Sequence, residues 1–162
     1  MRKGRQLLSL PVVEALTGEQ LGEVKELLYD SRERRLIGFI IADGGWLRKA
    51  KAVLLSQVQE ITDTAVVVED KSFVRDVGEI GDSLLTSCDV QGYTLITADG
   101  RELGIIQDLV VSPASGVIEG YELSDGIIDD LLKGRTTVAI SGRVDIVGEQ
   151  VIVTDMKGEE GQ

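Results

Sequence analysis

The chain repeats itself, because a shift of 82 residues aligns residues 18–44 with residues 100–126 without a gap. Seven of the 27 aligned positions are identical, and every glycine of the first window meets a glycine of the second. These glycines are Gly18, Gly22, Gly38 and Gly44 in the first copy and Gly100, Gly104, Gly120 and Gly126 in the second. Unrelated strand-rich segments do not coincide at every glycine, so we predict two copies of one small unit, with the glycines at turns or close contacts.

The repeat also defines how the chain divides. After a loop the match resumes at an offset of 85, with residues 53–56 on 138–141 and residues 66–68 on 151–153, so the second copy has three extra residues in that loop. We predict a first domain over residues 1–70, a linker over 71–86, a second domain over 87–156 and a disordered tail over 157–162. The linker is expected because that stretch lacks a strand pattern and contains helix-disfavouring glycines.

Each copy is expected to contain five short strands. Hydrophobic residues make up 43% of the chain and aromatic residues only 4%, so the core consists mostly of Val, Ile and Leu, which favour strands. The expected strands cover residues 11–16, 21–29, 35–43, 51–56 and 64–69, and then 92–98, 103–111, 117–124, 135–141 and 150–155. Short strands separated by tight turns such as Thr17-Gly18 and Asp99-Gly100 favour a small barrel. The predicted fold is all-β, two tandem small β-barrels with minor short helices, one of them over residues 127–132.

Both copies interrupt the alternation of their second strand with a polar pair. Lys25-Glu26 and Gln107-Asp108 stand at this point, and the apolar pattern resumes on the opposite phase at Leu27 and Leu109. One extra residue in one strand of a pair, a β-bulge, produces such a phase shift, and barrels use bulges to curve and close. We therefore predict a bulge in each copy.

The glycine and aliphatic pattern resembles a known family. Residues 18–24 and 100–106 each place a turn glycine before a strand that opens with Leu-Gly-x-aliphatic, and residues 41–44 and 123–126 end a later strand on Asp-Gly. In this order of elements the chain is similar to the PRC-barrel family over residues 5–70 and 87–155. The resemblance implies a β-barrel adaptor that contacts other proteins, without an active-site motif; fold alone does not establish function.

Charge restricts the partners. The chain carries 17 basic and 28 acidic residues, a net charge of −11, which disfavours nucleic acid because phosphate binding needs Lys and Arg. The excess is uneven: residues 1–80 hold 12 basic and 13 acidic residues, and residues 81–162 hold 5 and 15. We expect the two halves to face different surroundings.

The composition also argues against an enzyme. There is no histidine, the commonest general base and metal ligand, so we expect no catalysis, no catalytic residue, no metal site and no cofactor. Cys88 is the only cysteine, which excludes an intrachain disulfide and favours the cytoplasm. No stretch approaches the ~20 apolar residues of a membrane-spanning helix.

Basic residues gather at two places in the first copy. Arg32, Arg34 and Arg35 lie at an expected hairpin tip, and Arg48, Lys49 and Lys51 follow Trp46 in the next loop. The arginines are either solvated hairpin residues or a contact for an acidic partner or RNA. Trp46 is either a lid on the barrel end or an exposed anchor, since Trp beside Arg is common in interface hot spots. These seven residues are the partner-binding candidates.

The corresponding loop of the second copy is acidic. Asp125, Asp129 and Asp130 either hold a cation, which takes oxygen ligands, or cap a turn and a short helix. We expect a non-catalytic protein-interaction or scaffolding module whose partner is another protein. The alternatives are an RNA- or ribosome-associated binding protein and a small-ligand or cation-binding protein.

Overall fold

The computed structural model describes residues 2–42, 50–80, 90–124 and 136–156. The strands are β1 (Arg2–Lys3), β2 (Pro11–Glu14), β3 (Gln20–Asp30), β4 (Arg35–Ala42), β5 (Lys51–Leu54), β6 (Val58–Ile61), β7 (Val66–Val68), β8 (Arg75–Asp76), β9 (Thr94–Thr97), β10 (Glu102–Val111), β11 (Ile118–Ser124), β12 (Thr136–Val147) and β13 (Gln150–Met156). Short helical turns are η1 (Gly4–Gln6), η2 (Leu55–Gln57), η3 (Lys71–Phe73) and α1 (Val77–Ile80). The all-β prediction is confirmed.

The second unit, β9 to β13, is a closed barrel. Its strands pair in the order β10, β11, β12, β13, β9, and β9 pairs again with β10, which completes the ring. The pairing of β13 with β9 is parallel and the other pairings are antiparallel. A closed ring leaves no exposed strand edge within the barrel.

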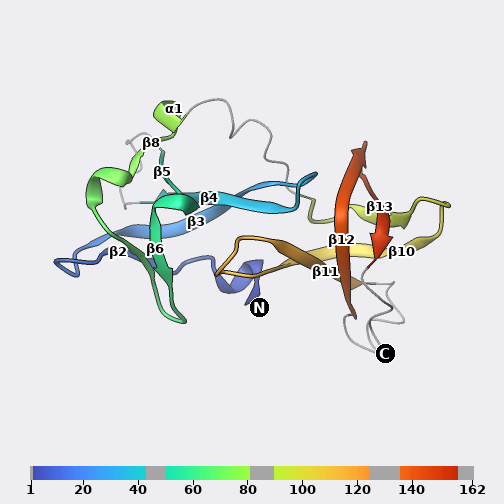
Figure 1. Cartoon of the computed structure of the whole chain (residues 1–162), viewed down its shortest axis with the longest axis horizontal. Coiled ribbons are helices and arrows are strands. Elements are labelled where there is room, and N and C mark those ends of the chain that lie inside the picture. The colour runs from blue at the N-terminus through green and yellow to red at the C-terminus, as the bar shows by residue number, and fades with distance from the viewer. Residues whose placement is uncertain (1, 43–49, 81–89, 125–135, 157–162) are drawn as a thin grey trace.

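The first unit, β2 to β8, follows the same ring order. Its strands pair as β6, β7, β2, β3, β4, β5, and the parallel pair β2–β7 corresponds to β9–β13. Among the described residues this sheet is curled and no strand pairing closes it, because β5 and β6, which η2 separates, stand where β12 of the second unit runs on as one strand. The two units lie at opposite ends of the molecule, and the long hairpins β3–β4 and β10–β11 extend toward each other between them (Figure 1).

The predicted bulges are present in both units. The register between β3 and β4 shifts between Val24 and Glu26, and that between β10 and β11 shifts between Ile106 and Asp108. The shift brings Val24 and Ile106 and, beyond the bulge, Leu28 and Leu109 into buried positions. Each long hairpin can therefore curve and keep its apolar residues in the core.

The described glycines of the repeat serve two structural purposes. Gly18 and Gly100 have φ values of 72° and 92° in open turns, a conformation that side chains rarely adopt. Gly22, Gly38, Gly104 and Gly120 lie against a neighbouring strand, and a Cβ on Gly22 would come within 2.6 Å of the Ala42 carbonyl oxygen. Gly44 and Gly126 lie outside the described residues.

The structure differs from the expected boundaries between residues 70 and 86. η3 follows β7, and β8 pairs with β5 through Lys51–Asp76 and Ala52–Arg75, so two residues of the expected linker belong to the first sheet. The strand is only two residues long, too short for a periodic sequence signal. One helical turn, α1, follows β8.

Two further strands exceed the expectation. β12 extends to Val147 because Gly142, with a φ of 73°, lets it bulge between Ser141 and Val144 and continue. β6 is the matching piece of the first unit, after η2. The polar residues in these pieces obscured the alternation that identifies a strand.

Apolar residues of both units form one core cluster. Tyr29 and Leu36 of the first unit and their repeat counterparts Val111 and Ile118 all belong to it, each at most 5% exposed. Within the described residues, no helix is long and apolar enough to cross a membrane. The predicted helix over 127–132 and the tail over 157–162 lie outside the described residues.

Candidate functional site

Three of the seven partner-binding candidates lie outside the described residues: Trp46, Arg48 and Lys49. The two ends of their segment are described, and both are fixed. Ile41 pairs with Lys51 across β4 and β5, and Val77 donates its backbone N–H to the Ala50 carbonyl at 2.9 Å. Cys88 and the acidic candidates Asp125, Asp129 and Asp130 are likewise outside the described residues.

Lys51 is a strand residue with a partner of its own. Its Nζ lies 2.7 Å from Asp76 Oδ1, and the two residues are also paired in the β5–β8 ladder. Both side chains are about one-third exposed, so this ion pair contributes little on its own. It adds to the backbone pairing that holds the base of the 43–49 segment on the barrel.

The arginine-rich tip of the β3–β4 hairpin contacts the second unit. The Arg34 guanidinium donates from Nε to the Gly142 carbonyl at 2.5 Å and from Nη1 to the Ile118 carbonyl. Val144 donates its N–H to the Arg32 carbonyl at 3.2 Å. Arg32 and Arg35 are exposed beside this contact. The structure thus uses Arg34 between the two units, a possibility that the sequence pattern alone did not reveal.

A β-bridge joins the two hairpins. Arg35 pairs antiparallel with Val117; Leu36 N–H donates to the Gly116 carbonyl at 2.6 Å and Ile118 N–H donates to the Arg34 carbonyl at 2.8 Å. Arg35 and Val117 are 82 residues apart, so each faces its own counterpart in the repeat. The two hydrogen bonds are likewise exchanged by the repeat. We call these contacts, with those of Arg34, the junction.

Residues 2–6, which we call the arm, precede the first unit and lie on the second. β1 pairs with β10, Arg2 with Val111 and Lys3 with Val110. The Arg2 guanidinium also donates to the Thr62 carbonyl of the first unit at 2.7 Å. The arm therefore connects the two units a second time.

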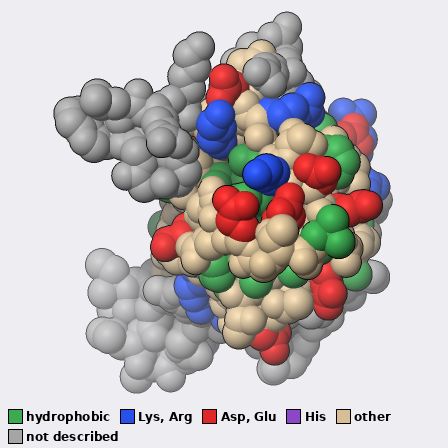
Figure 2. All heavy atoms as spheres, turned by 90° about the vertical axis from the view of Figure 1, so that its left-hand side faces the viewer, with side chains coloured by type: hydrophobic (Ala, Val, Ile, Leu, Met, Phe, Trp, Pro, Cys, Tyr) green, Lys and Arg blue, Asp and Glu red, His purple; other side chains and the backbone are tan. Residues whose placement is uncertain are grey.

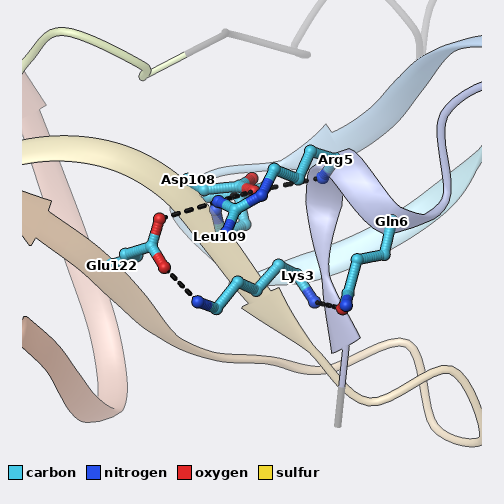
Figure 3. Close-up of polar contacts among 6 residues, drawn as sticks. All are labelled: Lys3, Arg5, Gln6, Asp108, Leu109 and Glu122. Atoms are coloured by element: carbon cyan, nitrogen blue, oxygen red, sulfur yellow. Dashed lines mark hydrogen bonds and ion pairs between the residues drawn. The ribbon is translucent and has the colours of Figure 1, made fainter. Parts of the chain in front are cut away.

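Two acidic residues of the second unit receive the arm (Figure 3). Asp108 and Glu122 stand opposite each other on β10 and β11, a like-charge pair that is unfavourable without a cation. Arg5 Nη1 lies 2.7 Å from Glu122 Oε1 and 3.2 Å from Asp108 Oδ2, and Lys3 Nζ pairs with Glu122 Oε2. The hydrogen bond and charge of Glu122, aided by Asp108, raise the pKa of the Arg5 guanidinium.

The Glu122 side chain is only 2% exposed, so this is the most buried acid of the described ion pairs. A buried carboxylate needs such partners, because an isolated charge in a protein interior is costly. Sequence reasoning missed this cluster. The available signal was an acid in each of two consecutive expected strands, residues 103–111 and 117–124, which calls for a cation from elsewhere.

Elsewhere, polar side chains hold turns. Glu14 accepts hydrogen bonds from the Lys71 N–H at 2.8 Å and from the Thr17 hydroxyl at 2.7 Å, and these lower the pKa of its carboxyl. In the second unit the Thr97 hydroxyl donates to Asp99 and lowers the pKa of that carboxyl. Among the described residues, no group of three or more His, Cys, Asp or Glu is placed to hold a metal ion.

The end of the first unit remote from the junction carries mixed charge. In Figure 2, acidic and basic side chains are interleaved there, with apolar side chains between them. Among the described residues, the most exposed large apolar side chain is that of Leu16, at 89%, in the turn between β2 and β3. This face has the composition of an ordinary protein surface more than that of a phosphate-binding one.

Comparison with known proteins agrees with the repeat. The family model for the PRC-barrel domain matches the chain twice, over residues 1–79 and 83–160. The uncharacterized protein YrrD of Bacillus subtilis (strain 168) is 25% identical over 139 residues, which cover 85% of this chain and 78% of that relative. Both halves match the family model and their strands follow the same order, so the chain belongs to the PRC-barrel family as a tandem of two PRC-barrel domains.

Proposed function

We propose that the chain is a non-catalytic protein-interaction module, in which two PRC barrels form one scaffold that binds a partner protein through the segment of Trp46, Arg48 and Lys49. The observation that carries the proposal is the fixed base of this segment. Ile41–Lys51 pairing, the Lys51–Asp76 ion pair and the Val77–Ala50 hydrogen bond hold residues on both sides of it. Binding residues on loops generally depend on such a rigid scaffold.

Residue chemistry supports a protein as the partner. A tryptophan supplies a large contact area, and neighbouring arginine and lysine supply charge-assisted hydrogen bonds to an acidic or carbonyl-rich surface. The polar clusters described above are already engaged in the fold: Arg34 at the junction, Arg5 and Lys3 on Glu122, and Glu14 in its turn. None of these offers the arrangement of nucleophile and base that catalysis needs.

Binding of RNA has less support than the arginine-rich sequence suggested. Arg34 donates to carbonyl groups of the second unit and Lys51 pairs with Asp76, which leaves Arg32 and Arg35 as the exposed members of the described cluster. Several free cations are needed for phosphate binding. An RNA gel shift that weakened steeply with salt would favour RNA over protein.

The proposal is tested with Trp46→Ala and Arg48→Glu in affinity capture from a lysate of the native cells. We expect both variants to lose a protein that the wild-type chain retains, while their melting temperatures stay within a few degrees of wild type. Arg101→Ala, which removes an exposed cation from the turn between β9 and β10, is the control and should retain it.

Tryptophan fluorescence reports separately on the same residue, since Trp46 is the only tryptophan. Red-shifted emission indicates an exposed anchor. Blue-shifted emission, together with a loss of about 3 kcal/mol or more in Trp46→Ala, would identify a buried core residue and refute the proposal.

A further inference from the structure

The junction has the form of a symmetric dimer interface. In a two-fold interface a residue at the axis meets its own equivalent, and each contact occurs twice with the roles exchanged. Arg35 meets Val117, its counterpart at the 82-residue offset, and the bonds Leu36 to Gly116 and Ile118 to Arg34 exchange roles in this way. The two units thus recognise each other as two subunits do.

The junction is also apolar at its centre. Leu36 and Ile118, which donate the two backbone bonds, are 3% and 1% exposed and belong to the core cluster shared by both units. A backbone bridge with buried aliphatic residues on both sides is typical of interfaces that persist, in contrast to weak contacts between mobile domains. Contacts of this kind can hold two units together without a linking peptide.

Differences in charge between the two units favour the pairing of a first unit with a second unit. The acids that receive the arm, Asp108 and Glu122, correspond in the first unit to Glu26 and Ile40, which pair with each other in the same register. The arm supplies Lys3 and Arg5, whereas residues 84–88, which precede the second unit, contain no Lys or Arg. A pair made of two second units would have no arm cations for its buried Glu122 side chains. A pair made of two first units would place the arm cations beside Ile40, which carries no charge.

We propose that the junction is a protein–protein interface in its own right, by which a first-type PRC-barrel unit binds a second-type unit as a separate polypeptide in preference to one of its own type. The partner that this surface fits is thus the complementary PRC-barrel unit. The covalent connection raises the local concentration of the two units without creating their contact. The inference does not depend on the Trp46 segment, so either proposal can fail without the other.

The test uses the full chain with a protease site inserted within residues 81–87. After the folded protein is cut and diluted to low micromolar concentration, size-exclusion chromatography and native mass spectrometry measure what remains together. We expect one complex with one copy of each fragment. Fragments that elute separately would overturn the proposal.

Arg34→Gly examines whether the contact occurs at this surface. Arg34 has a φ of 54° and its counterpart Gly116 has a φ of 77°, so glycine suits the backbone there and removes only the side chain. Loss of its two charge-assisted bonds should raise the Kd between the cut fragments about 10- to 100-fold, whereas Arg101→Ala should leave it unchanged. Equal Kd values for Arg34→Gly and wild type would place the association elsewhere.

Specificity is measured by dissociating the cut fragments in denaturant and refolding them together. Mixed pairs should exceed the half expected from random pairing, and the Lys3→Ala/Arg5→Ala variant should reduce that excess. Random pairing of wild-type fragments would contradict the proposed preference of a first unit for a second unit, even if the fragments stay together after the cut.

Discussion

The strands of the two units follow the same order, but the units differ at the corner that lies after β5 in one and within β12 in the other, and at the hairpin tip that docks on that corner. In the second unit, Gly142 allows β12 to bulge and continue, whereas in the first unit Gln57 stands at the matching position, and η2 replaces the bulge. The hairpin tips differ as well, with arginine in the first unit and glycine in the second. Arg34 donates to the Gly142 carbonyl, while Gly116 lies against Leu36 and Leu55.

The comparison shows how the two copies of a duplicated barrel can differ so that each copy fits the other copy better than it fits itself. The backbone bridge is symmetric, but the side chains around it differ between the two sides. On one side Arg34 donates to the Gly142 carbonyl, and on the other side Gly116 lies against Leu55. The cationic arm and its acidic receptor diverged in the same way. Each of these differences meets a corresponding difference in the other unit, an arrangement by which paired surfaces gain specificity.

The largest effects should occur where the two units remain the same. Gly38 and Gly120 lie so close to the Val53 and Val138 carbonyl oxygens that a Cβ would overlap them. Gly38→Ala and Gly120→Ala should each cost about 3 kcal/mol or more in the free energy of unfolding. Gly18→Ala and Gly100→Ala, in open turns, should cost about 1 kcal/mol, and urea denaturation measures all four. Similar losses in the free energy of unfolding for all four variants would mean that close packing does not set the cost at Gly38 and Gly120.

The next effect concerns the arm, where the units differ. Lys3→Ala/Arg5→Ala removes both cations from Glu122 and should lower the melting temperature by roughly 5 °C or more. Adding Glu122→Ile, which copies Ile40 of the first unit, should recover much of that loss because the buried charge is gone. Lys25→Ala, which removes an exposed cation from β3, serves as the control. Failure of Glu122→Ile to restore any stability would show that the cations do not act through this acid.

A smaller effect is expected in acid, where turn carboxylates such as Glu14 and Asp99 hold the fold of each unit. The pKa of Glu14 is lowered by the Lys71 N–H and the Thr17 hydroxyl, and that of Asp99 chiefly by the Thr97 hydroxyl. A carboxylate with a lowered folded pKa stabilises the fold above its unfolded pKa, and this contribution is lost as the pH falls through the folded value. Glu14→Gln and Asp99→Asn should therefore lose less stability than wild type between about pH 6 and pH 3. Parallel pH curves for wild type and variants would contradict this explanation.

The smallest effect at neutral pH should come from Tyr121, whose counterpart is Phe39. Burial raises the pKa of Tyr121 to about 12. Because the unfolded tyrosine ionises first, the folded chain loses stability from about pH 10 upward. Tyr121→Phe should change the free energy of unfolding at pH 7 by less than ~1 kcal/mol and reduce the alkaline loss. A tyrosine absorbance titration gives the pKa directly, and one in which every tyrosine ionises near pH 10 would rule out the burial effect.

Much of each ring was predictable because its signals are local. Glycine turns, the alternation of Val, Ile and Leu, and the polar pairs at Lys25 and Gln107 all act through near neighbours along the chain. The sequence pattern therefore located most strands and both bulges. It did not reveal β1, β6, β8 or the second half of β12, whose short or polar segments take their structure from the strands beside them.

The site was less predictable for a related reason. An arginine at a hairpin tip has the same local sequence whether it faces solvent or a second domain, so the role of Arg34 depends on an approach across 108 residues to Gly142. Glu122 likewise depends on an arm that lies more than 100 residues earlier. The partner-binding role of Trp46, Arg48 and Lys49 stays a prediction.

The most direct test of the reciprocal junction is an engineered disulfide between Arg35→Cys and Val117→Cys in a Cys88→Ser background. The flanking hydrogen bonds make this a non-hydrogen-bonded antiparallel pair, whose close side chains suit a disulfide. We predict nearly complete oxidation within the monomer, seen as a faster band on non-reducing gels that dithiothreitol abolishes, and no such band when Val147→Cys, in an exposed strand end, replaces Val117→Cys. Free thiols at both positions, or disulfides formed only between chains, would contradict the junction.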